Sequence, residues 1–144
     1  SASVAEGTWK LRVEDRSAGG TGTLNKWSLT FPSLENQTSY TVPDPGTVES
    51  SITVEGVSGK APKALRVGVD LTHEWLGEVK VDLVDPAGTV YALKATNGTD
   101  PGGTLSTTYT VDASASVAEG TWKLRVEDRS AGGTGTLDTW SLTF

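Results

Sequence analysis

Apolar and polar residues alternate along most of the chain, and this period of two predicts β-strands. Two segments near the C-terminus place their large apolar residues on one face: Trp122, Leu124 and Val126 in the first, and Trp140, Leu142 and Phe144 in the second. The glycine-rich residues 128–135 separate the two segments, which predicts a β-hairpin with a long connection. No stretch of ten residues has an apolar period of 3.6, so no helix is expected.

The middle of the chain has the same alternation, interrupted by turn signals rich in Pro, Gly, Asn and Asp. Residues 32–36 are interpreted as a linker. About eight strands at this spacing predict an all-β fold, an antiparallel jelly-roll β-sandwich or barrel. The strands expected before the hairpin cover residues 39–42, 48–57, 64–72, 79–85, 90–94 and 107–111.

The chain contains a long internal repeat. Residues 1–31 and 114–144 are identical at 29 of 31 positions and differ only at Asn25/Asp138 and Lys26/Thr139. The offset of 113 residues equals the length of residues 32–144. We therefore interpret residues 1–31 as an orphan copy of the C-terminal hairpin of a preceding unit, and residues 32–144 as a complete unit. Two hairpins within one larger fold remain the alternative.

The first copy carries the same apolar face as the last, and a lone hairpin is only marginally stable in water. One hairpin is in surplus, which suggests self-association through hairpin exchange between chains. The alternative is that residues 1–31 pack on the outside of the body. The residues concerned are Trp9, Leu11, Val13, Trp27, Leu29 and Phe31.

The composition excludes several classes of partner and of catalytic chemistry. The net charge is −6, the sequence pI is about 4.7 and no cluster of Lys and Arg occurs, so nucleic acid is not an expected partner. No apolar run approaches the length of a membrane span, so no membrane partner is expected. The absence of Cys excludes disulfides and thiol chemistry, and the single histidine excludes any mechanism that needs two imidazoles.

His73, the single histidine, sits at a predicted strand end without a nucleophile-elbow motif, which favours a structural role beside a carboxylate over catalysis. Trp75 follows it in a predicted loop and is the best candidate for an exposed contact with a partner, and His73 is predicted as an interaction residue beside it. The other tryptophans lie on apolar strand faces and are expected in the core. Three acids at strand ends or loops could bind calcium, or could simply be turn and solubility residues: Glu78, Asp100 and Asp128.

Three stretches resemble the P-domain (P/Homo B domain) of proprotein convertases, in its bacterial form. Residues 67–83 read VGVDLTHEWLGEVKVDL, residues 85–89 read DPAGT, and residues 120–144 begin with GTW and end with WSLTF. The sequence has Gly133 (and Gly20) where the family commonly has Asp, and Glu78 where Asp is usual. The resemblance covers about residues 37–144 and again 1–31.

The resemblance implies a jelly-roll domain without catalytic residues that follows the catalytic domain of a secreted, extracellular subtilisin-like serine peptidase or metallopeptidase. Such a domain docks on the catalytic domain of the same parent chain, stabilises it, and in bacterial examples is thought to aid substrate binding or bind calcium. No cofactor is required. The alternative function is a tandem-repeat structural or interaction module that assembles by strand exchange.

Overall fold

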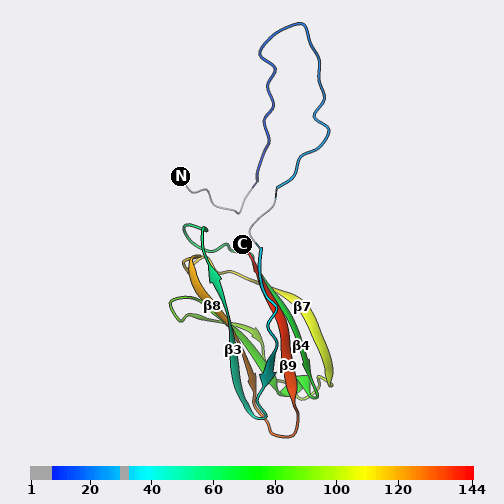
Figure 1. The fold of residues 1–144 in the computed structure, drawn as a ribbon, viewed down its shortest axis with the longest axis vertical. Coiled ribbons are helices and arrows are strands. Elements are labelled where there is room, and N and C mark those ends of the chain that lie inside the picture. The colour runs from blue at the N-terminus through cyan, green and yellow to red at the C-terminus, as the bar shows by residue number, and fades with distance from the viewer. Residues whose placement is uncertain (1–7, 30–32) are drawn as a thin grey trace.

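The computed structural model describes residues 8–29 and 33–144 and shows two antiparallel sheets packed face to face (Figure 1). Within the described residues there is no α-helix, and one short 3₁₀ helix, η1, covers Leu76–Glu78. The strands are β1 (Ser33–Asn36), β2 (Tyr40–Val42), β3 (Gly46–Val54), β4 (Leu65–His73), β5 (Val79–Val84), β6 (Val90–Lys94), β7 (Gly103–Val111), β8 (Gly120–Asp128) and β9 (Gly135–Thr143).

Strands that are close in sequence are mostly divided between the two sheets. One sheet has the order β3-β8-β5-β6, and the other has the order β1-β9-β4-β7, with β2 pairing with β9 beyond β1. The last hairpin therefore places β8 at the centre of one sheet and β9 at the centre of the other. In β9 the register shifts at Asp138, where one extra residue forms a β-bulge opposite β4.

The core lies between the sheets and is formed by the apolar faces that the alternation predicts. Trp122 and Trp140 are 0% and 2% exposed, which confirms their expected place. Each indole N–H has a partner, because Trp122 Nε1 donates to the carbonyl oxygen of Ala118 at 2.8 Å and Trp140 Nε1 donates to Ser50 Oγ at 2.9 Å. The rings of Trp122 and Phe144 meet edge to face, with their centroids 6.0 Å apart.

The all-β sandwich is confirmed, and most predicted strands agree with the structure to within a few residues. The linker prediction for residues 32–36 is wrong, because Ser33–Asn36 form β1 and pair with β9 from Thr143 to Trp140. Strand β7 begins at Gly103, four residues earlier than predicted, because the loop before it contains glycines that usually indicate a turn. Nine strands are present in the described part of the chain, where about eight were expected.

The described part of the first hairpin copy is exposed to solvent, whereas its counterpart, β8 and β9, is buried in the sandwich. Residues 8–29 extend away from the sandwich, contain no strand and are exposed throughout (Figure 1). Their large apolar side chains, including Trp9 and Trp27, are 41% to 70% exposed. The expectation that these two tryptophans pack in a core is therefore wrong, because β8 and β9 already fill the matching positions of the body. Phe31 lies outside the described residues.

Candidate functional site

The described chain carries its most unusual polar group at the end of the sandwich where β4 finishes. The His73 side chain is fully buried there, and its Nε2 lies 2.9 Å from Oδ2 of the equally buried Asp128. The backbone N–H of Trp75 donates to His73 Nδ1 at 2.9 Å, so Nε2 carries the proton and donates it to the carboxylate. Both ring nitrogens are occupied, which leaves neither available as a catalytic base.

Gly133 in the β8–β9 connection and Gly135 at the start of β9 allow this part of the chain to lie directly over the His73 ring. A Cβ atom at Gly135 would lie 2.5 Å from His73 Cδ2, and one at Gly133 would lie 3.0 Å from Trp75 Cδ1. The same connection is bonded to the residue after the histidine, since the Thr134 hydroxyl donates to Glu74 Oε1 at 2.8 Å and the Glu74 N–H donates to the Thr134 carbonyl at 3.0 Å. Gly133 therefore serves this close packing.

Trp75 lies at the surface beside this buried pair, as the sequence predicted. It is 54% exposed, whereas Trp122 and Trp140 are buried. Its backbone is held by His73, and the next residue, Leu76, donates its N–H to the Pro101 carbonyl at 3.3 Å. An indole on such a firmly bonded segment presents apolar area at a low cost in conformational entropy.

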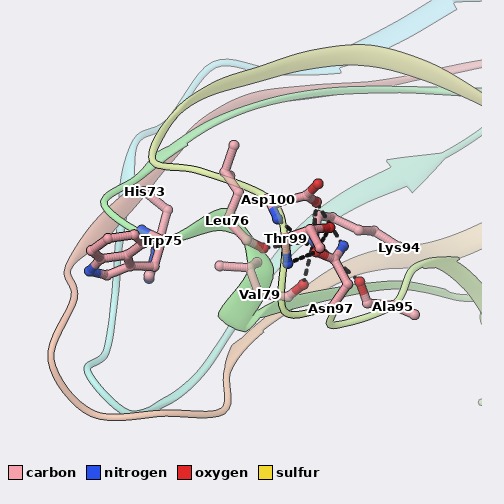
Figure 2. Close-up of polar contacts among 9 residues, drawn as sticks. All are labelled: His73, Trp75, Leu76, Val79, Lys94, Ala95, Asn97, Thr99 and Asp100. Carbon is pink, nitrogen blue, oxygen red and sulfur yellow. Dashed lines mark hydrogen bonds and ion pairs between the residues drawn. The ribbon is translucent and has the colours of Figure 1, made fainter.

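Lys94 holds the loops at this end of the sandwich together by hydrogen bonds, a role that the sequence did not indicate. Its ammonium donates to the carbonyl oxygens of Leu76, Val79 and Ala95 at 2.7, 3.0 and 3.2 Å, and lies 3.5 Å from Asp100 Oδ2 (Figure 2). The side chain is only 9% exposed. Because three of the four acceptors belong to the backbone, no residue pattern in the sequence could have identified this group.

The structure does not bring the three predicted calcium ligands together, and two of them are bonded to other side chains. Asp100 accepts a hydrogen bond from Asn97 Nδ2 at 2.9 Å, and this bond together with the charge of Lys94 lowers its pKa below the usual value. Asp128 binds His73, and Glu78 lies in η1 with its Oε2 buried and without a hydrogen-bond partner. Among the described residues there is no group of three or more His, Cys, Asp or Glu side chains placed to hold a metal ion.

An open depression of about 580 Å³ lies next to the buried histidine. Its wall combines small residues and hydroxyl groups with one carboxylate, that of Glu74. Hydroxyls and exposed backbone can bind an extended peptide, but no nucleophile in the described chain is hydrogen-bonded to His73. The lining residues are Thr41, Thr72, His73, Glu74, Gly102, Gly103, Thr134, Gly135 and Thr136.

A second buried carboxylate, Asp85, stabilises the turn after β5. Burial by itself raises its pKa, but the Ser116 hydroxyl at 2.6 Å and the backbone N–H groups of Thr89 and Ala87 outweigh burial and lower the pKa below 3.8. Tyr91 donates in turn to the Ser116 hydroxyl. The sequence predicted the turn from its Asp-Pro-Ala-Gly pattern, but not this network, because Ser116 lies 31 residues away.

Comparison with known proteins agrees with this architecture. The family model of the proprotein convertase P-domain matches residues 1–31 and 62–144. The chain is 43% identical over 139 residues to the transglutaminase-activating metalloprotease of Streptomyces mobaraensis, which covers 93% of this chain and 18% of that protein. It is 45% identical over 114 residues to leupeptin-inactivating enzyme 1 of Streptomyces exfoliatus, covering 78% of this chain and 26% of that protein.

Among solved structures, the serine protease of Aeromonas sobria has a similar fold. The match has a TM-score of 0.55 at 18% identity and covers 78% of this chain and 27% of that chain. The described residues include no helix long and apolar enough to cross a membrane. The chain thus spans only about a fifth to a quarter of its curated relatives, and it belongs to the proprotein convertase P-domain family.

Proposed function

We propose that this domain docks on the catalytic domain of an extracellular peptidase and stabilises it, through the end of the sandwich that carries Trp75. P-domains are non-catalytic accessory domains, and the relatives named above are peptidases. One relative of this chain, 30% identical over 97 residues, is the extracellular basic protease of Dichelobacter nodosus, which supports an extracellular location. The parent peptidase is a metallopeptidase or a subtilisin-like serine peptidase.

The exposed and well-anchored Trp75 is the observation that supports docking at this end. A tryptophan that is 54% exposed leaves a large apolar area in water, and such residues contribute strongly at protein interfaces. The bonds from the N–H of Trp75 to His73 and from the N–H of Leu76 to Pro101 hold it before a partner arrives. Docking there would bury the indole without reordering the loop.

The test uses a chimera in which residues 33–144 replace the matching region of the Streptomyces mobaraensis metalloprotease. We expect Trp75→Ala to lower the temperature at which the chimera loses peptidase activity, while the melting temperature of the isolated domain stays unchanged. Val117→Ala removes another exposed apolar side chain and serves as the matched control. Equal inactivation temperatures for the Trp75→Ala and unmodified chimeras would refute docking through Trp75. A raised KM with unchanged inactivation temperature would assign the residue to substrate binding instead.

The second candidate function is a tandem-repeat module, in which residues 1–31 close a preceding P-domain and residues 32–144 form the next. The alignment with the Streptomyces mobaraensis protein supports it, because coverage of 93% of the chain must include most of residues 1–31. Exchange between two complete chains would bury no more apolar surface than the two separate chains do. Two such chains have two bodies for four hairpins, so two hairpins stay exposed in either arrangement. Strand exchange is therefore proposed between neighbouring units of one chain.

Calcium is not required for the function proposed here. Asp100 and Asp128 are already bonded to Lys94 and His73, and the Lys94 ammonium binds the carbonyl oxygens at this end. Melting curves in calcium chloride and in EDTA test this, and a melting temperature that falls on chelation would show that an ion takes part.

A further inference from the structure

We infer that the site occupied by β8 and β9 also accepts residues 1–31 of the same chain, so that the two copies can exchange as the closing hairpin. The β8–β9 site is defined here as the edges and inner faces of β1, β2, β3, β4 and β5 that β8 and β9 contact. The inference is independent of docking to a peptidase. It rests on the register of the sheets and on the identity of the two copies.

The six buried apolar side chains of β8 and β9 have identical counterparts in the first copy. The six apolar residues of β8 and β9 are at most 2% exposed, whereas their counterparts 113 residues earlier are at least 41% exposed. Exchange replaces each buried side chain with an identical one, so neither the packing volume nor the buried apolar area changes. The pairs are Trp122/Trp9, Leu124/Leu11, Val126/Val13, Leu137/Leu24, Trp140/Trp27 and Leu142/Leu29.

The two positions that differ lie where a change is tolerated. Asp138 and Thr139 occupy the bulge of β9, and both side chains are only partly buried. Thr139 faces Asp70 of β4, so Lys26 at the same position would place an ammonium opposite that carboxylate. Asn25 at the position of Asp138 keeps an oxygen that can accept the hydrogen bond now donated by the Thr72 hydroxyl.

The chain connection also permits exchange within one molecule. Leu142 of β9 lies opposite Leu34 of β1, and its counterpart Leu29 precedes Leu34 by only five positions. Ser33 pairs with Thr143, the counterpart of position 30, so two residues would join the antiparallel neighbours, which is the commonest length for a hairpin loop. The first copy therefore reaches the site without any rearrangement of β1.

Exchange in cis is favoured over exchange between chains by effective concentration. The first copy is tethered beside the site that it would fill, so its local concentration far exceeds that of a second chain. Exchange between chains offers no compensating gain, because the number of unplaced hairpins stays the same.

The first experiment uses the full chain and one substitution in each copy. Leu124→Asp should leave a cooperative thermal transition, because Leu11 can take the place of Leu124, and Leu11→Asp alone should melt like the unmodified chain. The double variant should lose its folded baseline. Leu83→Asp is the matched control. Leu83 is the cross-strand partner of Leu124 in the same sheet and is equally buried. It has no second copy, so this variant should not fold. If Leu124→Asp unfolds as completely as the double variant, the inference is wrong.

The second experiment detects the exchanged pairing directly, since the chain has no cysteine. Thr53 and Thr121 are cross-strand partners with their hydroxyls 3.3 Å apart, and Thr8 is the counterpart of Thr121. In the Leu124→Asp chain, Thr8→Cys with Thr53→Cys should form an intramolecular disulfide under mild oxidation. Thr53→Cys with Thr121→Cys in the otherwise unmodified chain is the positive control. A disulfide-linked dimer, or no disulfide at all, would overturn exchange in cis.

Discussion

Replacing His73 by alanine tests the structural role assigned to the buried histidine. The substitution removes the imidazole that binds Asp128 and accepts the N–H of Trp75. Asp128 would stay buried with one remaining donor, the backbone N–H of Ser130 at 3.1 Å. Because the imidazole is neutral, the substitution removes one hydrogen bond to a buried carboxylate, which costs about 1.5–3 kcal/mol.

For a domain of this size, each kcal/mol lowers the melting temperature by about 4 °C, so His73→Ala should melt about 6–12 °C below the unmodified chain. Because His73 lies in β4, which is not duplicated, the first copy cannot compensate for this change. Tryptophan fluorescence in urea and on heating measures the loss.

Thr72→Ala is the control, because Thr72 is the exposed neighbour of His73 and its loss should change the stability by less than about 0.5 kcal/mol. A destabilisation below about 1 kcal/mol for His73→Ala would refute the reasoning, since it would mean that water already solvates Asp128. Neither variant should change the rate at which a peptide substrate is cleaved, because no cleavage by this domain is expected.

Three other changes test separate contacts. Asp85→Asn should reduce the free energy of unfolding at pH 7. Because the folded-state pKa of Asp85 is lowered from 3.8, this loss should shrink as the pH falls below about 4. Urea unfolding at several pH values measures it, and a loss that persists in strong acid would contradict the assignment. Lys94→Met should cost about 1.5–3 kcal/mol by removing the ammonium that binds three carbonyl oxygens, and an unchanged midpoint of chemical unfolding would show that these bonds add nothing. Gly102→Ala should cost about 1–3 kcal/mol, because the new Cβ would lie 2.0 Å from the Glu74 carbonyl oxygen, whereas Gly98→Ala meets no atom within 4 Å and should melt normally.

The sequence predicted the strands well where one face is apolar, and less well where pairing depends on distant residues. The alternation in β8 and β9 reports burial directly, so their inward residues could be assigned before the fold was known. Strand β1 carries one large apolar residue, Leu34, and forms because β9 offers it an edge, which no local pattern shows. The bulge at Asp138 depends in the same way on the register between β4 and β9.

The candidate site was predicted in part for similar reasons. The exposure of Trp75 followed from its place in a loop, and a carboxylate partner for His73 was expected. That this partner is Asp128, 55 residues away, depends on the meeting of β4 and β8 at one end of the sandwich. The role of Lys94 could not be predicted, because its acceptors are mainly backbone oxygens positioned by η1 and the β6–β7 connection.

The course of β9 restricts how the domain can sit on a neighbour in the same polypeptide. Gly135 at its start faces His73, while Thr143 at its end faces Ser33, so the entry and exit of residues 33–144 lie at the pole opposite Trp75. Nine strand residues separate the two poles, a span of roughly 25–30 Å. A catalytic domain joined before Ser33 could touch Trp75 only by lying alongside the sandwich, so the length of the joining segment would govern whether the two can meet.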